Sequence, residues 1–180
     1  MEDRSSPQLW IEPGGAGWVD VVPARRDLPR TLPDMATVSV VELDADAPRP
    51  SGAGYLYRRT SRPGQGRLTG PPTIGLSIVL ITPRHDDDEA ARALRDWGDF
   101  VHLNHIAAAA VPGYTMITPY EVVGAGPRYL HLYEMDTDDP ERAVLAMTPL
   151  VRDRLGPEEF EAWAWHPELR IDYVSSFRRS

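Results

Sequence analysis

The sequence IGLSIVLIT at residues 74–82 decides the fold of this chain. It is nearly all apolar, it is rich in β-branched side chains, and Pro72 and Pro83 bound it. This pattern is typical of a central strand that is buried on both faces. We therefore predict a strand in the middle of a sheet, and the segments that follow it indicate which sheet.

A long helix is predicted directly after this strand. Acidic residues at 86–89 complement the positive end of a helix dipole, and apolar residues then recur at helical spacing. Pro112 and Gly113 end the pattern. We predict a helix over about residues 86–108.

The remaining segments complete a recognisable order. Residues 114–122 and 128–135 alternate well enough to form a hairpin, Pro140 starts a second helix that runs to about Leu155, and residues 169–177 form a last strand. The order β, α, β, β, α, β is that of a ferredoxin-like unit. Right-handed crossovers place both helices on one face of a four-stranded antiparallel sheet.

The other face of that sheet must also be covered. Leaving it in water would cost roughly 25 cal/mol for each Å² of apolar surface. We expect a second sheet to pack against it. That sheet could come from a second copy of the chain, which would make a homodimer, or from the first part of the same chain.

The first 60 residues look like a reduced copy of the same unit. Residues 42–48, ELDADAP, parallel residues 134–140, EMDTDDP, and each run follows an apolar strand. Accidental similarity between two acidic turns is the alternative. Strands are predicted at 19–22, 37–43 and 55–59. The predicted organisation is a degenerate β-rich half-repeat at 1–60, a Pro/Gly linker or lid at 61–72 and a complete unit at 73–180.

The amino-acid composition excludes several kinds of catalytic group and partner. The chain has 180 residues, 42% of them hydrophobic, which is enough to bury a core. It has no cysteine and no lysine, which excludes thiolate nucleophiles, cysteine-ligated metals and lysine Schiff bases. A net charge of -8 without a basic and aromatic run argues against nucleic acid. We found neither a signal peptide nor an apolar run of membrane-spanning length, so we expect a cytoplasmic protein without a membrane partner.

The predicted long helix carries the candidate catalytic residues. Asp99, His102 and His105 occur at positions i, i+3 and i+6, which places neighbours on adjacent turns. A histidine held by a carboxylate is a plausible general base near neutral pH. We predict His102 as the base, Asp99 as the group that orients it, and His105 or Tyr114 as a proton donor. The alternatives are a structural His102 that bonds a backbone carbonyl, and a metal site, for which no further ligand is evident.

Aromatic residues around this helix could bind a flat hydrophobic molecule. His131 lies on the predicted third strand and could line the same pocket. The predicted substrate-binding residues are Trp97, Tyr114, Tyr120, His131 and Tyr133.

A family resemblance rests on the same region. The run 97–106, WGDFVHLNHI, followed by VPGY at 111–114, resembles the EthD-like branch of the dimeric α+β barrel superfamily, and YLHLYEMD at 129–136 is similar to the third strand of that family. The resemblance covers about residues 72–180. It implies a pocket between sheet and helices. Members are often small, cofactor-independent cyclases, decarboxylases, isomerases or monooxygenases that act on aromatic or polyketide-like molecules, and others have no known activity.

Different functions fit these observations. The first is a cofactor-independent enzyme of specialised metabolism, including antibiotic biosynthesis, that cyclises, isomerises or decarboxylates a small aromatic or polyketide substrate by histidine acid–base chemistry, with no cofactor and no metal. The second is a non-catalytic small-molecule-binding or accessory protein. A third is a cofactor-free monooxygenase.

Overall fold

The computed structural model describes residues 8–22, 31–60 and 73–180. The predicted linker at 61–72 lies outside these residues. The elements, in chain order, are β1 (Gln8–Asp20), β2 (Thr37–Leu43), β3 (Tyr55–Arg59), β4 (Gly75–Pro83), α1 (Asp88–Trp97), the π-helical segment η1 (Gly98–His102), α2 (Leu103–Ala108), β5 (Tyr114–Val122), β6 (Tyr129–Met135), α3 (Pro140–Arg154), α4 (Pro157–Ala164) and β7 (Leu169–Arg179). None of the described helices is long and apolar enough to cross a membrane.

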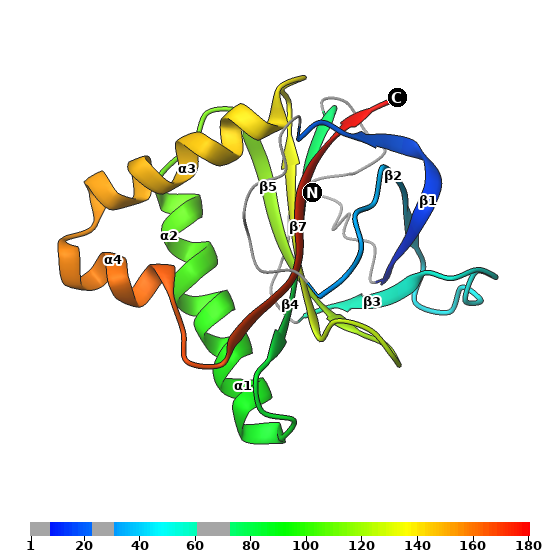
Figure 1. The fold of residues 1–180 in the computed structure, drawn as a ribbon, viewed down its shortest axis with the longest axis horizontal. Coiled ribbons are helices and arrows are strands. Elements are labelled where there is room, and N and C mark those ends of the chain that lie inside the picture. The colour runs from blue at the N-terminus through cyan, green and yellow to red at the C-terminus, as the bar shows by residue number, and fades with distance from the viewer. Residues whose placement is uncertain (1–7, 23–30, 61–72) are drawn as a thin grey trace.

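The strands form one antiparallel sheet that closes into a barrel (Figure 1). Their order is β2-β1-β3-β5-β6-β4-β7, and an additional pairing between β1 and β7 closes the ring. Strands β5, β6, β4 and β7 are those of the predicted ferredoxin-like unit, and its helices lie together on one side of them. The βαββαβ order predicted from the sequence is therefore confirmed.

The first strand is longer than the sequence suggested. It begins at Gln8 instead of Val19, and a register shift between Pro13 and Trp18 bends it. Gly14 and Gly17 adopt φ angles of 78° and 110°, a left-handed conformation that glycine tolerates best. The bend lets one strand pair with β3 through its first half and with β7 through its second half. Proline and glycine obscured this strand in the sequence because they are uncommon inside strands.

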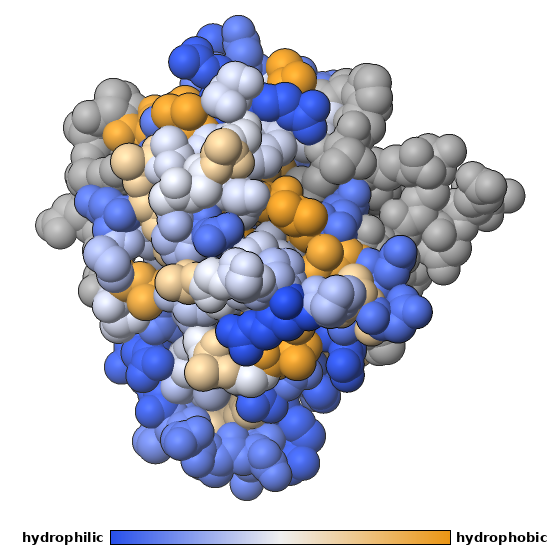
Figure 2. Space-filling model, turned by 90° about the vertical axis from the view of Figure 1, so that its right-hand side faces the viewer, coloured by the Kyte–Doolittle hydropathy of each residue, from blue (hydrophilic) through white to orange (hydrophobic). Residues whose placement is uncertain are grey.

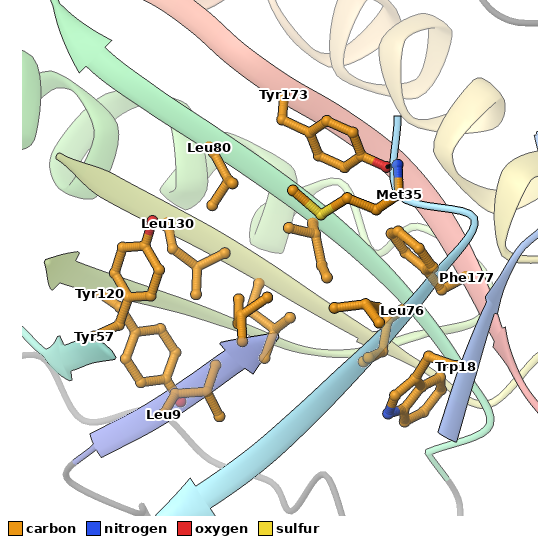
Figure 3. Packing of buried hydrophobic residues seen from close by; sticks show 14 residues of the cluster. Leu9, Trp18, Met35, Tyr57, Leu76, Leu80, Tyr120, Leu130, Tyr173 and Phe177 are labelled. Atoms are coloured by element: carbon orange, nitrogen blue, oxygen red, sulfur yellow. Dashed lines mark hydrogen bonds between the residues drawn. The ribbon is translucent and has the colours of Figure 1, made fainter. Parts of the chain in front are cut away.

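The apolar face of the ferredoxin-like sheet is covered from within the chain. Leu9, Ile11 and Tyr57 from the N-terminal strands pack against Leu76 and Leu130 inside the barrel (Figure 3). Coverage by the same chain was one of the two expected solutions. This face does not require a partner, so a homodimer would use another surface and remains a prediction.

The helices cover the opposite side of the sheet. Alternation along β6 sends Leu130 and Leu132 into the barrel, whereas Tyr133 and Met135 pack with residues of α2 and α3. A smaller cluster, which includes Tyr129, joins α1 to the strands. The candidate catalytic helix therefore packs against the outer face of the barrel wall.

The predicted long helix contains a π-helical turn. Leu103 N–H bonds the carbonyl of Gly98, five residues earlier, and the five residues Gly98–His102 form the π segment between α1 and α2. A π turn changes the angular spacing of the side chains, and such turns are frequent at functional sites. The α-helical spacing assumed for Asp99 and His102 therefore does not hold.

Candidate functional site

His102 is half-buried and its ring contacts two indoles. Its ring stacks on Trp163 with centroids 5.0 Å apart and an interplanar angle of 8°, and it lies 4.9 Å from the ring of Trp97. His102 Nδ1 and the Trp163 carbonyl are 3.0 Å apart, and Trp163 Nε1 donates in return to the His102 carbonyl at 3.0 Å. This reciprocal pair fixes the imidazole against α4.

The α4 helix supplies these contacts. It starts at Gly156 and Pro157, where proline suits the first helical turn. Trp97 Nε1 donates to the Ala162 carbonyl at 2.8 Å, so both indoles tie α1 and η1 to α4. Nothing in the residue spacing of the sequence identified Trp163 as a neighbour of His102.

His131 lies on β6 and forms the floor of the group of rings made by His102, Trp97, Trp163 and His131, which we call the His102 cluster. It is 4% exposed, and its ring stacks on that of His102 with centroids 6.2 Å apart. A Cβ atom at Gly98 would lie 3.0 Å from His131 Nε2, so the absence of a side chain lets the helix approach the strand. The close approach explains why glycine stands at the start of the π turn.

Both imidazoles are neutral at pH 7. Burial, with a smaller contribution from nearby His105, lowers the pKa of His102 to about 4, although its bond to the Trp163 carbonyl acts in the opposite direction. Burial and the proximity of His102 lower the pKa of His131 to about 3. A base of such low pKa accepts protons weakly near neutral pH.

Asp99 lies in a different environment from His102. It is 7% exposed and lines a groove of about 400 Å³. His102 Nδ1 contacts the Trp163 carbonyl, and orientation of the ring by the Asp99 carboxylate stays a prediction. The groove is lined by Arg59, Thr60, Arg95, Asp96, Asp99, Phe100 and Glu121.

A second groove, of about 370 Å³, lies between α2 and the start of β5. We call it the apolar groove. Its lining residues are Ile106, Ala107, Ala110, Val111, Tyr114, Thr115, Met116 and Ile117. Ala110 has a φ angle of 49°, which is a strained, left-handed conformation for a residue with a side chain. Apolar side chains with one phenol and one threonine hydroxyl suit a flat hydrophobic ligand better than an ion.

The predicted binding residues do not share one pocket. Trp97 and His131 belong to the His102 cluster, whereas Tyr114 and Tyr133 lie between sheet and helices with their rings 5.6 Å apart. The prediction that Tyr120 lines the same pocket is wrong. Tyr120 belongs to the core inside the barrel, on the other face of the sheet. An irregularity in β5 between Tyr114 and Met116 alters the alternation that the sequence prediction assumed.

One further titratable residue was missed by the sequence reasoning. Glu134 on β6 is 4% exposed and accepts a hydrogen bond from Thr73 Oγ1 at 3.1 Å. Burial, with a contribution from Glu42, raises its pKa to about 7, against the effect of the Thr73 bond. Its position in an apolar strand was the signal available in the sequence. Within the described residues, no group of three or more His, Asp or Glu side chains could hold a metal ion.

Comparisons with known proteins support the fold alone. Neither a family model nor a curated protein sequence matches the chain. A solved structure described as a major regulator of staphylococcal pathogenesis aligns with a TM-score of 0.56 and 9% identity over 95% of this chain and 98% of its own. The dimeric chlorite dismutase of Nitrobacter winogradskyi aligns with a TM-score of 0.52 and 13% identity over 96% of this chain and 99% of its own. The chain therefore has the α+β fold of the dimeric α+β barrel, ferredoxin-like class.

Proposed function

We propose that the chain binds a small, flat, hydrophobic molecule in the apolar groove. The observation that carries this proposal is the composition of the groove, because Tyr114 and Thr115 are the lining residues with polar side chains and none of the lining residues is charged. Its volume of about 370 Å³ lies in the range of ligand pockets. With no carboxylate, imidazole or guanidinium among its walls, binding is the function that the groove supports best.

Two neighbouring alanines provide a matched test. Ala107 lines the groove, whereas Ala108 follows it on the same exposed surface of α2 and does not. We expect Ala107→Phe to fill the groove and to weaken binding of 2-naphthol by about tenfold or more, measured by fluorescence anisotropy. Ala108→Phe should leave the affinity unchanged. Equal affinities in wild type and Ala107→Phe would exclude the groove as the binding site.

Catalysis by His102 is the second candidate. It corresponds to an EthD-like, cofactor-independent cyclase, isomerase, decarboxylase or monooxygenase acting on an aromatic or polyketide substrate. The favouring observation is an imidazole that is uncharged at neutral pH, stacked on Trp163 and in tilted contact with the ring of Trp97. Since Nδ1 contacts a carbonyl, Nε2 would have to accept the proton.

Proton abstraction can be tested without knowing the substrate. Wild type should catalyse deuterium exchange into the methyl group of acetophenone, followed by NMR, and His102→Ala should lower the rate by about two orders of magnitude. His85→Ala, which removes an exposed imidazole away from the His102 rings, serves as the control and should leave the rate unchanged. The exchange rate should stay constant as the pH is lowered, until the pH approaches the His102 pKa of about 4. Exchange that His102→Ala leaves unchanged would reject the catalytic role.

A further inference from the structure

Two buried polar atoms without hydrogen-bond partners lie on the outward face of β1. They are Trp10 Nε1 and Gln8 Oε1, and no other buried side-chain nitrogen or oxygen of the described residues lacks a partner. Trp10 is 1% exposed and Gln8 is 7% exposed. Residues two apart on a strand share a face. Because buried polar groups are nearly always bonded, an unpaired donor and an unpaired acceptor on the same face of one strand indicate a missing group that would bond them.

The segment at 44–54, which we call the strap, covers these atoms. Gln8 Nε2 donates to the Ala45 carbonyl at 3.2 Å, and the Arg49 guanidinium lies 5.4 Å from the centre of the Trp10 ring. A Cβ atom at Gly54 would lie 2.6 Å from Trp10 Cε2, the carbon bonded to Nε1. The strap backbone therefore rests on the edge of the indole that bears the unpaired N–H.

The strap is a thin cover. In the C-terminal unit the corresponding connection forms α3, which buries Val144 and Val151 against the sheet. Within the strap only Gly54 is buried. Segments with few buried contacts open at low cost. The strap lies on the side of the barrel away from the helices, and that side of the molecule is largely hydrophilic with separate hydrophobic patches (Figures 1 and 2).

We propose that the outward face of β1 beneath the strap is a binding site for a neutral, polyhydroxylated ligand such as a monosaccharide, with the strap as its lid. Trp10 Nε1 would donate to a ligand oxygen, and Gln8 Oε1 would accept from a ligand hydroxyl. Glu12 extends this row as an acceptor, since its carboxylate lies against Gly52, and Arg49 extends it as a donor. Hydroxyl groups both donate and accept, so they match this mixture of partners. The indole supplies a flat apolar surface for the ring of the ligand.

Indole NMR signals test the site directly. The chain has five tryptophans, and Trp10→Phe assigns the Trp10 indole N–H signal in the full-length protein. We expect D-glucose to shift that signal in a saturable way and to leave the Trp97 and Trp163 signals in place. Gln8→Leu, which removes the acceptor, should weaken the apparent affinity by about fivefold or more.

Two results would overturn the proposal, and both come from wild-type protein, so they do not depend on folding of a variant. The first is a Trp10 signal that glucose leaves unmoved up to the solubility limit of the sugar. The second is a lasting cross-peak between the Trp10 indole proton and water that glucose does not displace, because a buried water would then satisfy the pair. A failure here leaves 2-naphthol binding in the apolar groove untouched, because that groove lies on the helix-covered side of the barrel, away from the strap.

Discussion

Acidification should destabilise the chain through its stacked imidazoles. The pKa values of His102 and His131 are about 4 and about 3 in the folded chain, against an ordinary value of 6.5. The unfolded chain therefore binds more protons below pH 6.5. The stability contributed by the neutral imidazoles is complete above that pH and is lost as pH falls toward 4 and then 3.

The size of the effect follows from the pKa differences. At pH 5, about 1.5 units below the unfolded value, each histidine is protonated in the unfolded chain and neutral in the folded chain. At about 1.4 kcal/mol per pKa unit, each residue then lowers the free energy of unfolding by about 2 kcal/mol. Glu134 acts in the opposite direction over part of this range because its pKa is raised to about 7. The wild-type profile alone therefore mixes both effects.

A substitution at one histidine separates the two effects. His131→Leu removes one imidazole, and any cost of repacking is the same at both pH values. We expect the difference in free energy of unfolding between wild type and His131→Leu, from urea titrations, to shift by about 2 kcal/mol between pH 7 and pH 5. Leu132→Ala shortens a side chain on the same strand and removes no titratable group. It should lower the free energy of unfolding by the same amount at pH 7 and at pH 5. A wild-type to His131→Leu gap that stays constant within about 0.5 kcal/mol would refute the reasoning.

Four further substitutions test individual contacts. Glu134→Gln should gain about 2 kcal/mol relative to wild type between pH 5 and pH 8 in urea unfolding, because a carboxyl whose pKa is raised by burial loses stability as pH rises toward 7; parallel profiles would contradict this. Ala110→Gly should stabilise by about 1 kcal/mol and raise the Tm, since glycine relieves the left-handed backbone; a lower Tm counts against it. Gly98→Ala should lower the Tm despite its helix propensity, because its Cβ would crowd His131; a rise would show that the floor of the cluster is not tightly packed. Trp163→Phe keeps the stack but removes the indole N–H, and should cost about 1 kcal/mol in thermal unfolding; an unchanged stability would show that the bond contributes nothing.

The sequence determined the ferredoxin-like unit because each of its elements carries a local signal. The apolar run at 74–82, the acidic start of the first helix and the turn around Gly124 and Gly126 depend on neighbours in the chain, and the structure reproduces their order. The sequence did not determine whether His131 faces the helices or the inside of the barrel. Only the pairing of the strands in the sheet decided it. The N-terminal strand at 8–18 was missed because Pro13 and the glycines after it hide its alternation.

The site depended on contacts between distant segments, which no local pattern encodes. The stack of His102 on Trp163 joins residues 61 positions apart, and a π turn altered the helical spacing assumed for Asp99 and His102. Tyr120 entered the barrel because pairing irregularities set which face of β5 it occupies. Sequence fixes residue types and short-range geometry, whereas burial, and with it the lowered pKa of His102 and His131, exists only once the helices pack on the sheet.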